Sequence, residues 1–243
     1  MEIIAGQRET WTEYVKVIHT DINEPSIFTR ENGVIYYNDG TDLIAVSLYD
    51  ENIRDLVLND NTTRIADYAF RDFKTFETID LSNCTKLTYI GIEAFYRAGM
   101  REFIVSPSIT TIRRYAFSYN PDLVSIDLQN TQITTLDQYT FAGCTSLEHL
   151  ALPSTIKSFG TGTFNGCTGL KSIYIPISVT RIYADAKTYS PFLNCKSSLK
   201  IYCEASSKGS EWDTYWKHYS DSYSLTAYYG YTYEQYLTAV GLQ

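Results

Sequence analysis

A short apolar phrase recurs along the middle of this chain at a nearly fixed interval. It reads Leu-x-x-Ile-x-Leu, then a polar gap and Ile-x-x-Ile, and ends with Ala-Phe or Thr-Phe five residues after the last apolar position. The closing phenylalanines follow one another at steps of 25, 22, 24 and 23 residues and are Phe70, Phe95, Phe117, Phe141 and Phe164. Self-similarity with a period of about 20 to 50 residues is typical of a solenoid.

Each half of the phrase predicts one side of a coil. The first half, as in Leu123-x-x-Ile126-x-Leu128, alternates with period two and indicates a short strand with one buried face. Strands one coil apart would pair in parallel, because a lone coil cannot bury its apolar side. The second half, as in Ile109-x-x-Ile112, is expected on the opposite side of each coil, with the phenylalanine filling the bend.

The N-terminal residues lack the repeat. Two β-rich runs, Gly33–Tyr37 and Leu43–Leu48, flank Asn38-Asp39-Gly40, which is a strong hairpin turn signal. We expect this hairpin to cover the open apolar end of the first coil. Upstream, Trp11 to Ile18 carry apolar residues at helical spacing.

The repeat phrase also stops beyond Glu204, where aromatic residues accumulate. Trp212, Tyr215, Trp216 and Tyr219 have the spacing of an amphipathic helix with an aromatic face. Thr232-x-x-Gln235 is a capping-box signal for a last short helix. Terminal units of solenoids are atypical because they seal the stack, so sealing accounts for these tails without a further function.

The sixth coil departs from the pattern, because its phenylalanine arrives only at Phe192. The segment from Ala184 to Pro191 is therefore interpreted as an inserted loop. Such insertions are either tolerated surface loops or part of a binding face.

Three of the five cysteines follow the repeat. Each lies three residues after a phenylalanine, where earlier repeats hold Phe73, Ala98 and Asn120; the three are Cys144, Cys167 and Cys195. A disulfide framework would not exchange cysteine for these residues, so we interpret the thiols as small interior side chains. The alternative, a metal site, lacks a Cys-x-x-Cys pair and a nearby histidine pair. We expect no metal and no cofactor.

Charge and hydropathy exclude some partners. The net charge of −8 at pH 7 argues against nucleic-acid binding, which requires a basic face. No apolar run reaches the roughly 18 residues of a membrane span. The first 20 residues lack a signal-peptide core, which is interrupted by Gln7, Arg8, Glu9 and Glu13. Either the protein stays in the cytoplasm, or Met1 begins a segment of an exported precursor.

Several segments together resemble BspA-type leucine-rich repeats. The resemblance covers roughly residues 33–217 and is carried by Ile90-Gly91-Ile92-Glu93-Ala94-Phe95, by Phe141-Ala142-Gly143-Cys144-Thr145-Ser146-Leu147, and by Phe164 to Ile182. It implies an exported or surface-attached bacterial protein, so it favours an extracellular or cell-surface location and adhesion to a protein partner such as a host matrix or cell-surface protein. The family brings no catalytic residues with it.

The expected fold is therefore a leucine-rich-repeat solenoid of the α/β class. It should be right-handed and β-rich, with parallel strands on a concave face and short turns or 3-10 segments elsewhere. We expect an N-terminal cap with a β-hairpin (1–50), an array of about six to seven coils (51–204) and an aromatic C-terminal cap (205–243).

The outward residues of the strands form the predicted partner-binding surface. The first four coils present an acidic band, and the later coils present a histidine and tyrosines as anchors; the predicted residues are Asp55, Asp80, Glu102, Asp127, His149, Tyr174 and Tyr202. A solvated face with incidental charges is the other interpretation of the same pattern.

The sequence offers two further function classes. The many tyrosines between Tyr215 and Tyr236 could stack on sugars, which would make the chain a carbohydrate-binding module. An enzyme is disfavoured, since Gly-x-Ser-x-Gly, His-Glu-x-x-His and phosphate-loop motifs are missing. The three histidines, His19, His149 and His218, fall in separate regions.

Overall fold

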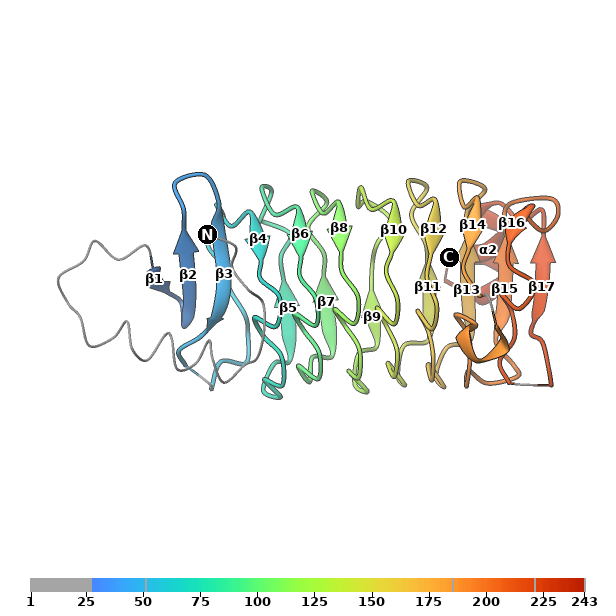
Figure 1. Ribbon diagram of the computed structural model, residues 1–243, viewed down its shortest axis with the longest axis horizontal. Coiled ribbons are helices and arrows are strands. Elements are labelled where there is room, and N and C mark those ends of the chain that lie inside the picture. The colour runs from blue at the N-terminus through green and yellow to red at the C-terminus, as the bar shows by residue number, and fades with distance from the viewer. Residues whose placement is uncertain (1–27, 51, 185, 221, 243) are drawn as a thin grey trace.

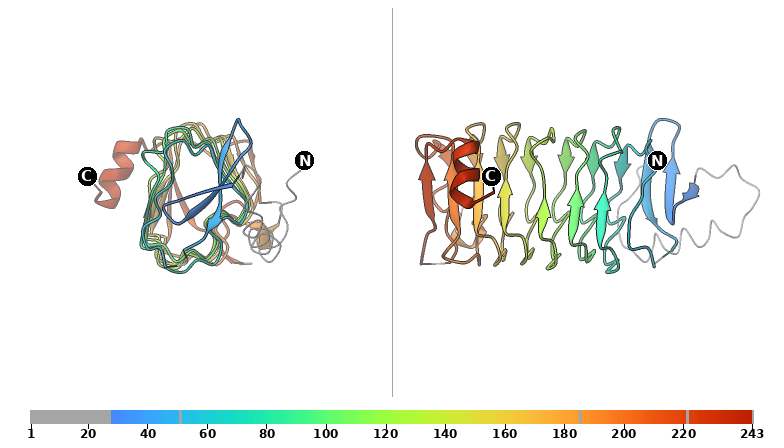
Figure 2. Two further views of the ribbon diagram at one scale, coloured as in Figure 1. Left: turned by 90° about the vertical axis from the view of Figure 1, so that its left-hand side faces the viewer. Right: turned by 180° about the vertical axis from the view of Figure 1, so that it is seen from behind.

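The coils stack along one long axis (Figure 1). The computed structural model describes residues 28–50, 52–184, 186–220 and 222–242. Seen from the end, successive coils superimpose (Figure 2), so the stack is nearly straight and its sides are flat. The predicted solenoid is confirmed, whereas the helix predicted over Trp11–Ile18 lies outside the described residues.

One side of the solenoid is a single ten-stranded sheet, called here the long sheet. Its order is β1-β2-β3-β4-β6-β8-β10-β12-β14-β16, and neighbours from β3 onward pair in parallel. Its strands are β1 (Phe28–Glu31), β2 (Val34–Asn38), β3 (Leu43–Leu48), β4 (Arg64–Ile65), β6 (Tyr89–Ile90), β8 (Thr111–Ile112), β10 (Thr135–Leu136), β12 (Ser158–Phe159), β14 (Arg181–Ile182) and β16 (Glu211–Trp212). From β4 to β14 the second half of the repeat phrase supplies these strands.

The opposite side carries two shorter parallel sheets, and the first half of the phrase forms most of their strands. The N-terminal short sheet contains β5 (Thr78–Asp80), β7 (Glu102–Ile104) and β9 (Ser125–Ile126). The C-terminal short sheet contains β11 (His149–Ala151), β13 (Ser172–Ile175), β15 (Lys200–Cys203) and β17 (Thr226–Tyr229). Strand pairing is interrupted between β9 and β11, which belong to different sheets. We call the outward surface of both short sheets the strand face.

A ladder of phenylalanines runs through the interior. Each ring stacks on the ring one coil away, with centroids between 5.3 and 6.0 Å apart; the members are Phe70, Phe95, Phe117, Phe141, Phe164 and Phe192. Phe192 takes its place despite the insertion before it, which includes the 3-10 turn η1 (Lys187–Tyr189). The insertion therefore loops outward without breaking the aromatic column.

The predicted hairpin opens the long sheet. Strands β2 and β3 pair antiparallel around the turn at Asp39–Asp42, and β3 then pairs in parallel with the first coil. Three residues of the hairpin strands, Val34, Tyr36 and Ala45, are buried in the core, so the hairpin covers the apolar end of the stack.

The C-terminal region differs from expectation in one respect. The helix predicted from Trp212 to Tyr219 does not form, because Glu211–Trp212 joins the long sheet as β16. Both indoles fill the interior instead: Trp212 and Trp216 are buried and meet edge to face at 4.9 Å. Aromatic residues at this spacing therefore seal the last coils rather than line one side of a helix.

The last predicted helix does form. Helix α2 (Tyr233–Val240) starts at Thr232, whose side chain accepts from the amide of Gln235 in a complete capping box. Figure 2 shows α2 outside the solenoid, lying against one side of the coils. That side is the C-terminal part of the strand face, since Tyr236 packs against Tyr174 and Tyr202.

Candidate functional site

The exposed part of the strand face presents two parallel rows of side chains. Register across β5, β7 and β9 aligns the first row as Asp55, Thr78, Glu102 and Ser125. The second row aligns as Val57, Asp80, Ile104 and Asp127. Neighbours within a row lie one strand spacing apart, about 4.8 Å.

Acidic and uncharged residues alternate along both rows. All four predicted acids are exposed, and the register never sets two of them directly opposite each other. Like charges directly opposite would destabilise the sheet, so this stagger lets one surface carry four carboxylates. The second row alternates acid with aliphatic residues, and Val57 and Ile104 are 55% and 44% exposed.

Two of the carboxylates also hold turns. Asp80 accepts from the amide of Ser82 at 2.9 Å, and Asp127 accepts from the amide of Gln129 at 2.8 Å. In both cases Oδ1 is the acceptor. These acids therefore stabilise the strand ends and contribute negative charge at the surface.

The two predicted tyrosine anchors are not at the surface, which corrects the sequence-based expectation. Tyr174 and Tyr202 point outward from β13 and β15, but they are only 3% and 4% exposed. Tyr236 of α2 lies over both, with ring centroids 5.4 and 5.5 Å away. The aromatic residues that could have anchored a partner hold the helix instead.

His149 connects this tyrosine cluster to the exposed rows. Its Nδ1 lies 2.7 Å from the hydroxyl of Ser172, which lies 3.1 Å from the hydroxyl of Tyr236. Burial lowers the pKa of His149, with the charge of Glu148 opposing and that of Lys171 adding to the effect. The imidazole is thus a half-buried partner in a polar network under α2.

A cleft lies where α2 meets the exposed rows. Its volume is about 250 Å³. Its floor comes from β7, β9 and β11 and its wall from the C-terminal residues; the lining includes Glu102, Ile104, Asp127, Tyr233, Leu237 and Leu242. The cleft therefore coincides with the interruption between the two short sheets. No sequence pattern indicated it, since residues more than a hundred positions apart form it.

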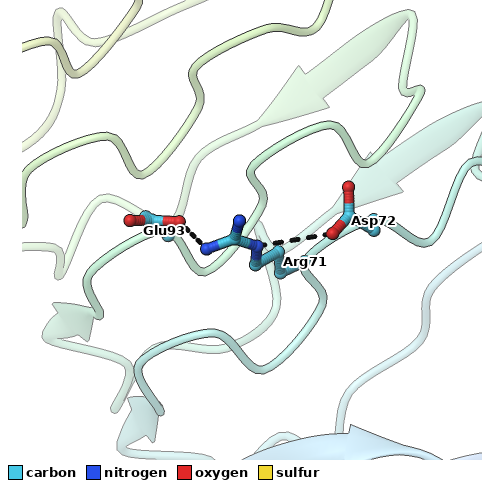
Figure 3. A network of polar contacts seen from close by, with 3 residues as sticks. All are labelled: Arg71, Asp72 and Glu93. Atoms are coloured by element: carbon cyan, nitrogen blue, oxygen red, sulfur yellow. Dashed lines mark hydrogen bonds and ion pairs between the residues drawn. The ribbon is translucent and has the colours of Figure 1, made fainter. Parts of the chain in front are cut away.

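A second charged cluster lies on the turns between coils, where one arginine meets two carboxylates. Figure 3 shows Arg71 between Asp72 and Glu93. Its guanidinium also lies 4.7 Å from the ring centroid of Tyr96. Because Glu93 belongs to the next coil, this cluster joins neighbouring coils, and its one guanidinium is already paired with two carboxylates.

The described sulfur and acidic groups are spread too far apart for a metal site. Within the described ranges, no three His, Cys, Asp or Glu side chains gather closely enough to hold an ion. All five cysteines are free and buried, and burial raises the pKa of Cys144 to about 12. A protonated, inaccessible thiol is unsuited to nucleophilic chemistry.

No helix among the described residues has the length and apolar character needed to cross a membrane.

Comparison with protein families gives one match. The family model for the BspA type leucine rich repeat region matches in six copies, over residues 44–86 and 63–198. No curated protein matches the chain.

Solved structures share the fold. A leucine-rich repeat protein of T. pallidum is 19% identical with a TM-score of 0.54, over 63% of this chain and 80% of that chain. A leucine-rich cell surface protein of Faecalibacterium prausnitzii A2-165 is 24% identical with a TM-score of 0.52, over 82% of this chain and 43% of that chain. At these identities the likeness concerns architecture alone.

Proposed function

We propose that this chain, which belongs to the BspA type leucine-rich repeat family, is a non-catalytic scaffold that binds a protein partner on its strand face. The observation that carries the proposal is that four exposed acids and two exposed aliphatic residues, Val57 and Ile104, share the two rows of the strand face. A surface with both kinds of group can attract a partner and then bury apolar area against it.

The charge pattern specifies the partner's chemistry. Asp55, Asp80, Glu102 and Asp127 would face a basic patch, which speeds encounter and fixes orientation more than it adds affinity. Val57 and Ile104 supply apolar contacts between the charges. The mixture of exposed aliphatic groups and exposed carboxylates supports a protein partner over a sugar.

We propose the extracellular side of a bacterial cell as the location and adhesion as the role. The named cell-surface protein with the same fold supports this placement. A host matrix or cell-surface protein is the partner class we expect.

The test uses immobilised chain and a panel of purified extracellular-matrix proteins. One variant neutralises the face by Asp55→Asn, Asp80→Asn, Glu102→Gln and Asp127→Asn. Asparagine keeps the Oδ1 acceptor of the two turn-holding acids, so the strand ends stay intact. The matched control neutralises four exposed turn acids elsewhere, by Asp39→Asn, Asp50→Asn, Asp60→Asn and Asp122→Asn.

Both variants change net charge equally, so only position distinguishes them. We expect the face variant to slow association with any matrix protein that binds the wild type, and the control to leave it unchanged. Equal effects of both variants, or none from the face variant, would contradict the proposal.

Carbohydrate binding is the competing function. Of the tyrosines between Tyr215 and Tyr236 that suggested it, Tyr236 is buried against Tyr174 and Tyr202, so that ring is not free to stack on a sugar. A glycan array incubated with the chain should therefore remain blank.

A further inference from the structure

The cleft beside α2 combines three kinds of group in one place. Ile104, Leu237 and Leu242 give it apolar walls, and Leu242 and Ile104 are both exposed. Glu102 and Asp127 place carboxylates in its lining. Its boundary thus changes from apolar to acidic across the cleft.

An unsatisfied donor also lies in the lining. The Nε2 atom of Gln129 is buried, and the described residues provide it with no hydrogen-bond partner. A buried donor without an acceptor costs about 1–3 kcal/mol. If the Gln129 amide turns into the cleft, a backbone carbonyl of a bound chain can accept from Nε2, and it carries no charge that the nearby carboxylates would repel.

The size of the cleft restricts its occupant. Small-molecule sites usually enclose about 300–1,000 Å³, which exceeds the volume of about 250 Å³ found here. A space of this size, open on one side, suits one or two side chains of a peptide rather than a cofactor.

We infer that the cleft binds one short peptide segment of the partner, in which an aliphatic side chain lies next to a lysine or arginine. The aliphatic group enters between Ile104 and Leu242, and the cation meets Glu102 and Asp127. This inference rests on the proposed function and adds the sequence type that the site selects. A second copy of this chain is a poor occupant, since each copy carries a net charge of −8 and like charges repel.

Labelled peptides test the inference directly. The probe is fluorescein-labelled Gly-Ser-Lys-Leu-Lys-Ser-Gly, and its binding to the full chain is measured by fluorescence anisotropy. Two control peptides replace both lysines by glutamate or the leucine by serine. We expect only the first peptide to bind, because it alone carries both the cations and the aliphatic group.

Matched variants then locate the binding. Glu102→Gln with Asp127→Asn neutralises the cleft, whereas Asp55→Asn with Asp80→Asn neutralises the same number of acids farther along the rows. Losing two partly exposed charge pairs should weaken binding about five- to tenfold for the cleft variant. The distal variant should change it less than about twofold.

A second pair of variants tests the apolar contact. Ile104→Ser should weaken binding about fivefold, whereas Val57→Ser, at an exposed position on the same row but outside the cleft, should not. Melting temperatures of all four variants report whether each still folds.

The outcomes separate this inference from the proposed function. Equal losses from the cleft and distal variants overturn the cleft and leave the strand face as the binding surface. Failure of the wild type to bind the first peptide overturns the inference, while the matrix-protein panel still tests the proposed function. A dimer in analytical ultracentrifugation that Ile104→Ser dissociates also overturns it, because a second copy then occupies the cleft.

Discussion

The thiol of Cys144 donates a hydrogen bond to the backbone carbonyl of Phe117 in the preceding coil, with 3.2 Å between sulfur and oxygen. Asn120 makes the equivalent contact one coil earlier, from Nδ2 to the carbonyl of Phe95 at 2.8 Å. The next coils repeat it from Cys167 to Phe141 and from Cys195 to Phe164. In these four coils the position holds a buried side chain with a donor, which explains why cysteine and asparagine replace each other there; Phe73 and Ala98 fill it in the first two coils without one.

Burial should protect every thiol from reagents in the folded protein. Burial raises the pKa of Cys144, Cys195 and Cys203 to about 12 and that of Cys84 to about 11. The thiolate is the reactive form, so at pH 8 almost none is present. We expect Ellman's reagent to detect no thiol in native protein and five in guanidinium chloride. Rapid labelling of a native thiol would show that the coils open locally.

Truncating the phenylalanine ladder at its centre should be costly. Phe117 stacks on Phe95 and Phe141, at 5.7 and 5.4 Å, so Phe117→Ala leaves a cavity between two coils. The free energy of unfolding should fall by about 3–5 kcal/mol, measured by urea denaturation. Tyr119→Ala, at an exposed position two residues away, is the control. A comparable loss in both variants would contradict a role specific to the ladder.

Close contact between coils should exclude a side chain at Gly169. A Cβ there would lie 2.1 Å from the carbonyl oxygen of Thr145, which is backbone and cannot rotate away. Gly169→Ala should therefore push two coils apart and destabilise the fold by about 1–3 kcal/mol.

Gly230→Ala provides the comparison for that substitution. Gly230 has a positive φ of 79° but open space around its Cβ position, so this variant should show only the backbone cost of about 1–2 kcal/mol. Thermal unfolding of the double variant should give the sum of the two effects, because the sites lie apart.

Acid should loosen the network beneath α2 through His149. Its pKa is lowered in the fold by burial, against about 6.5 in the unfolded chain, so the unfolded state takes up the proton first as pH falls. The contribution of neutral His149 to the free energy of unfolding is present above about pH 6.5 and is lost as pH falls through its pKa in the folded protein. His149→Gln should therefore lose less stability than wild type between pH 7.5 and 5.5 in urea denaturation. An identical pH dependence would exclude this role.

The repeat phrase was sufficient to predict the coil, because each apolar position recurs with the same environment. Ile65, Ile90 and Ile112 occupy one buried column, and a regular column can be recognised from spacing alone. The buried state of Cys144 followed from the same register. The sequence indicates that this position is interior, whereas the hydrogen bonds that Cys144 and Asn120 donate are seen only in the structure.

The C-terminal region was harder to predict, because no repeat constrains it. The spacing from Trp212 to Tyr219 is compatible with a helix and also with the last coil. The coil forms because the open apolar end of the stack buries both indoles. Tyr174 and Tyr202 were correctly placed on the outward side of their strands. Their burial depends on α2, whose Tyr236 packs over both rings. Because α2 is distant in the sequence, no local pattern could indicate this burial.

The most direct test of the binding account uses methyl signals in solution. Ile104 is exposed on the strand face, and Ile177 is 67% exposed on a turn away from the exposed rows. In isoleucine δ1-methyl-labelled chain, addition of the Lys-Leu-Lys peptide, or of a matrix protein that binds in the panel, should shift or broaden the Ile104 signal and leave Ile177 unchanged. A shift at Ile177 with Ile104 unaffected would contradict the account, because the partner would then bind elsewhere on the solenoid.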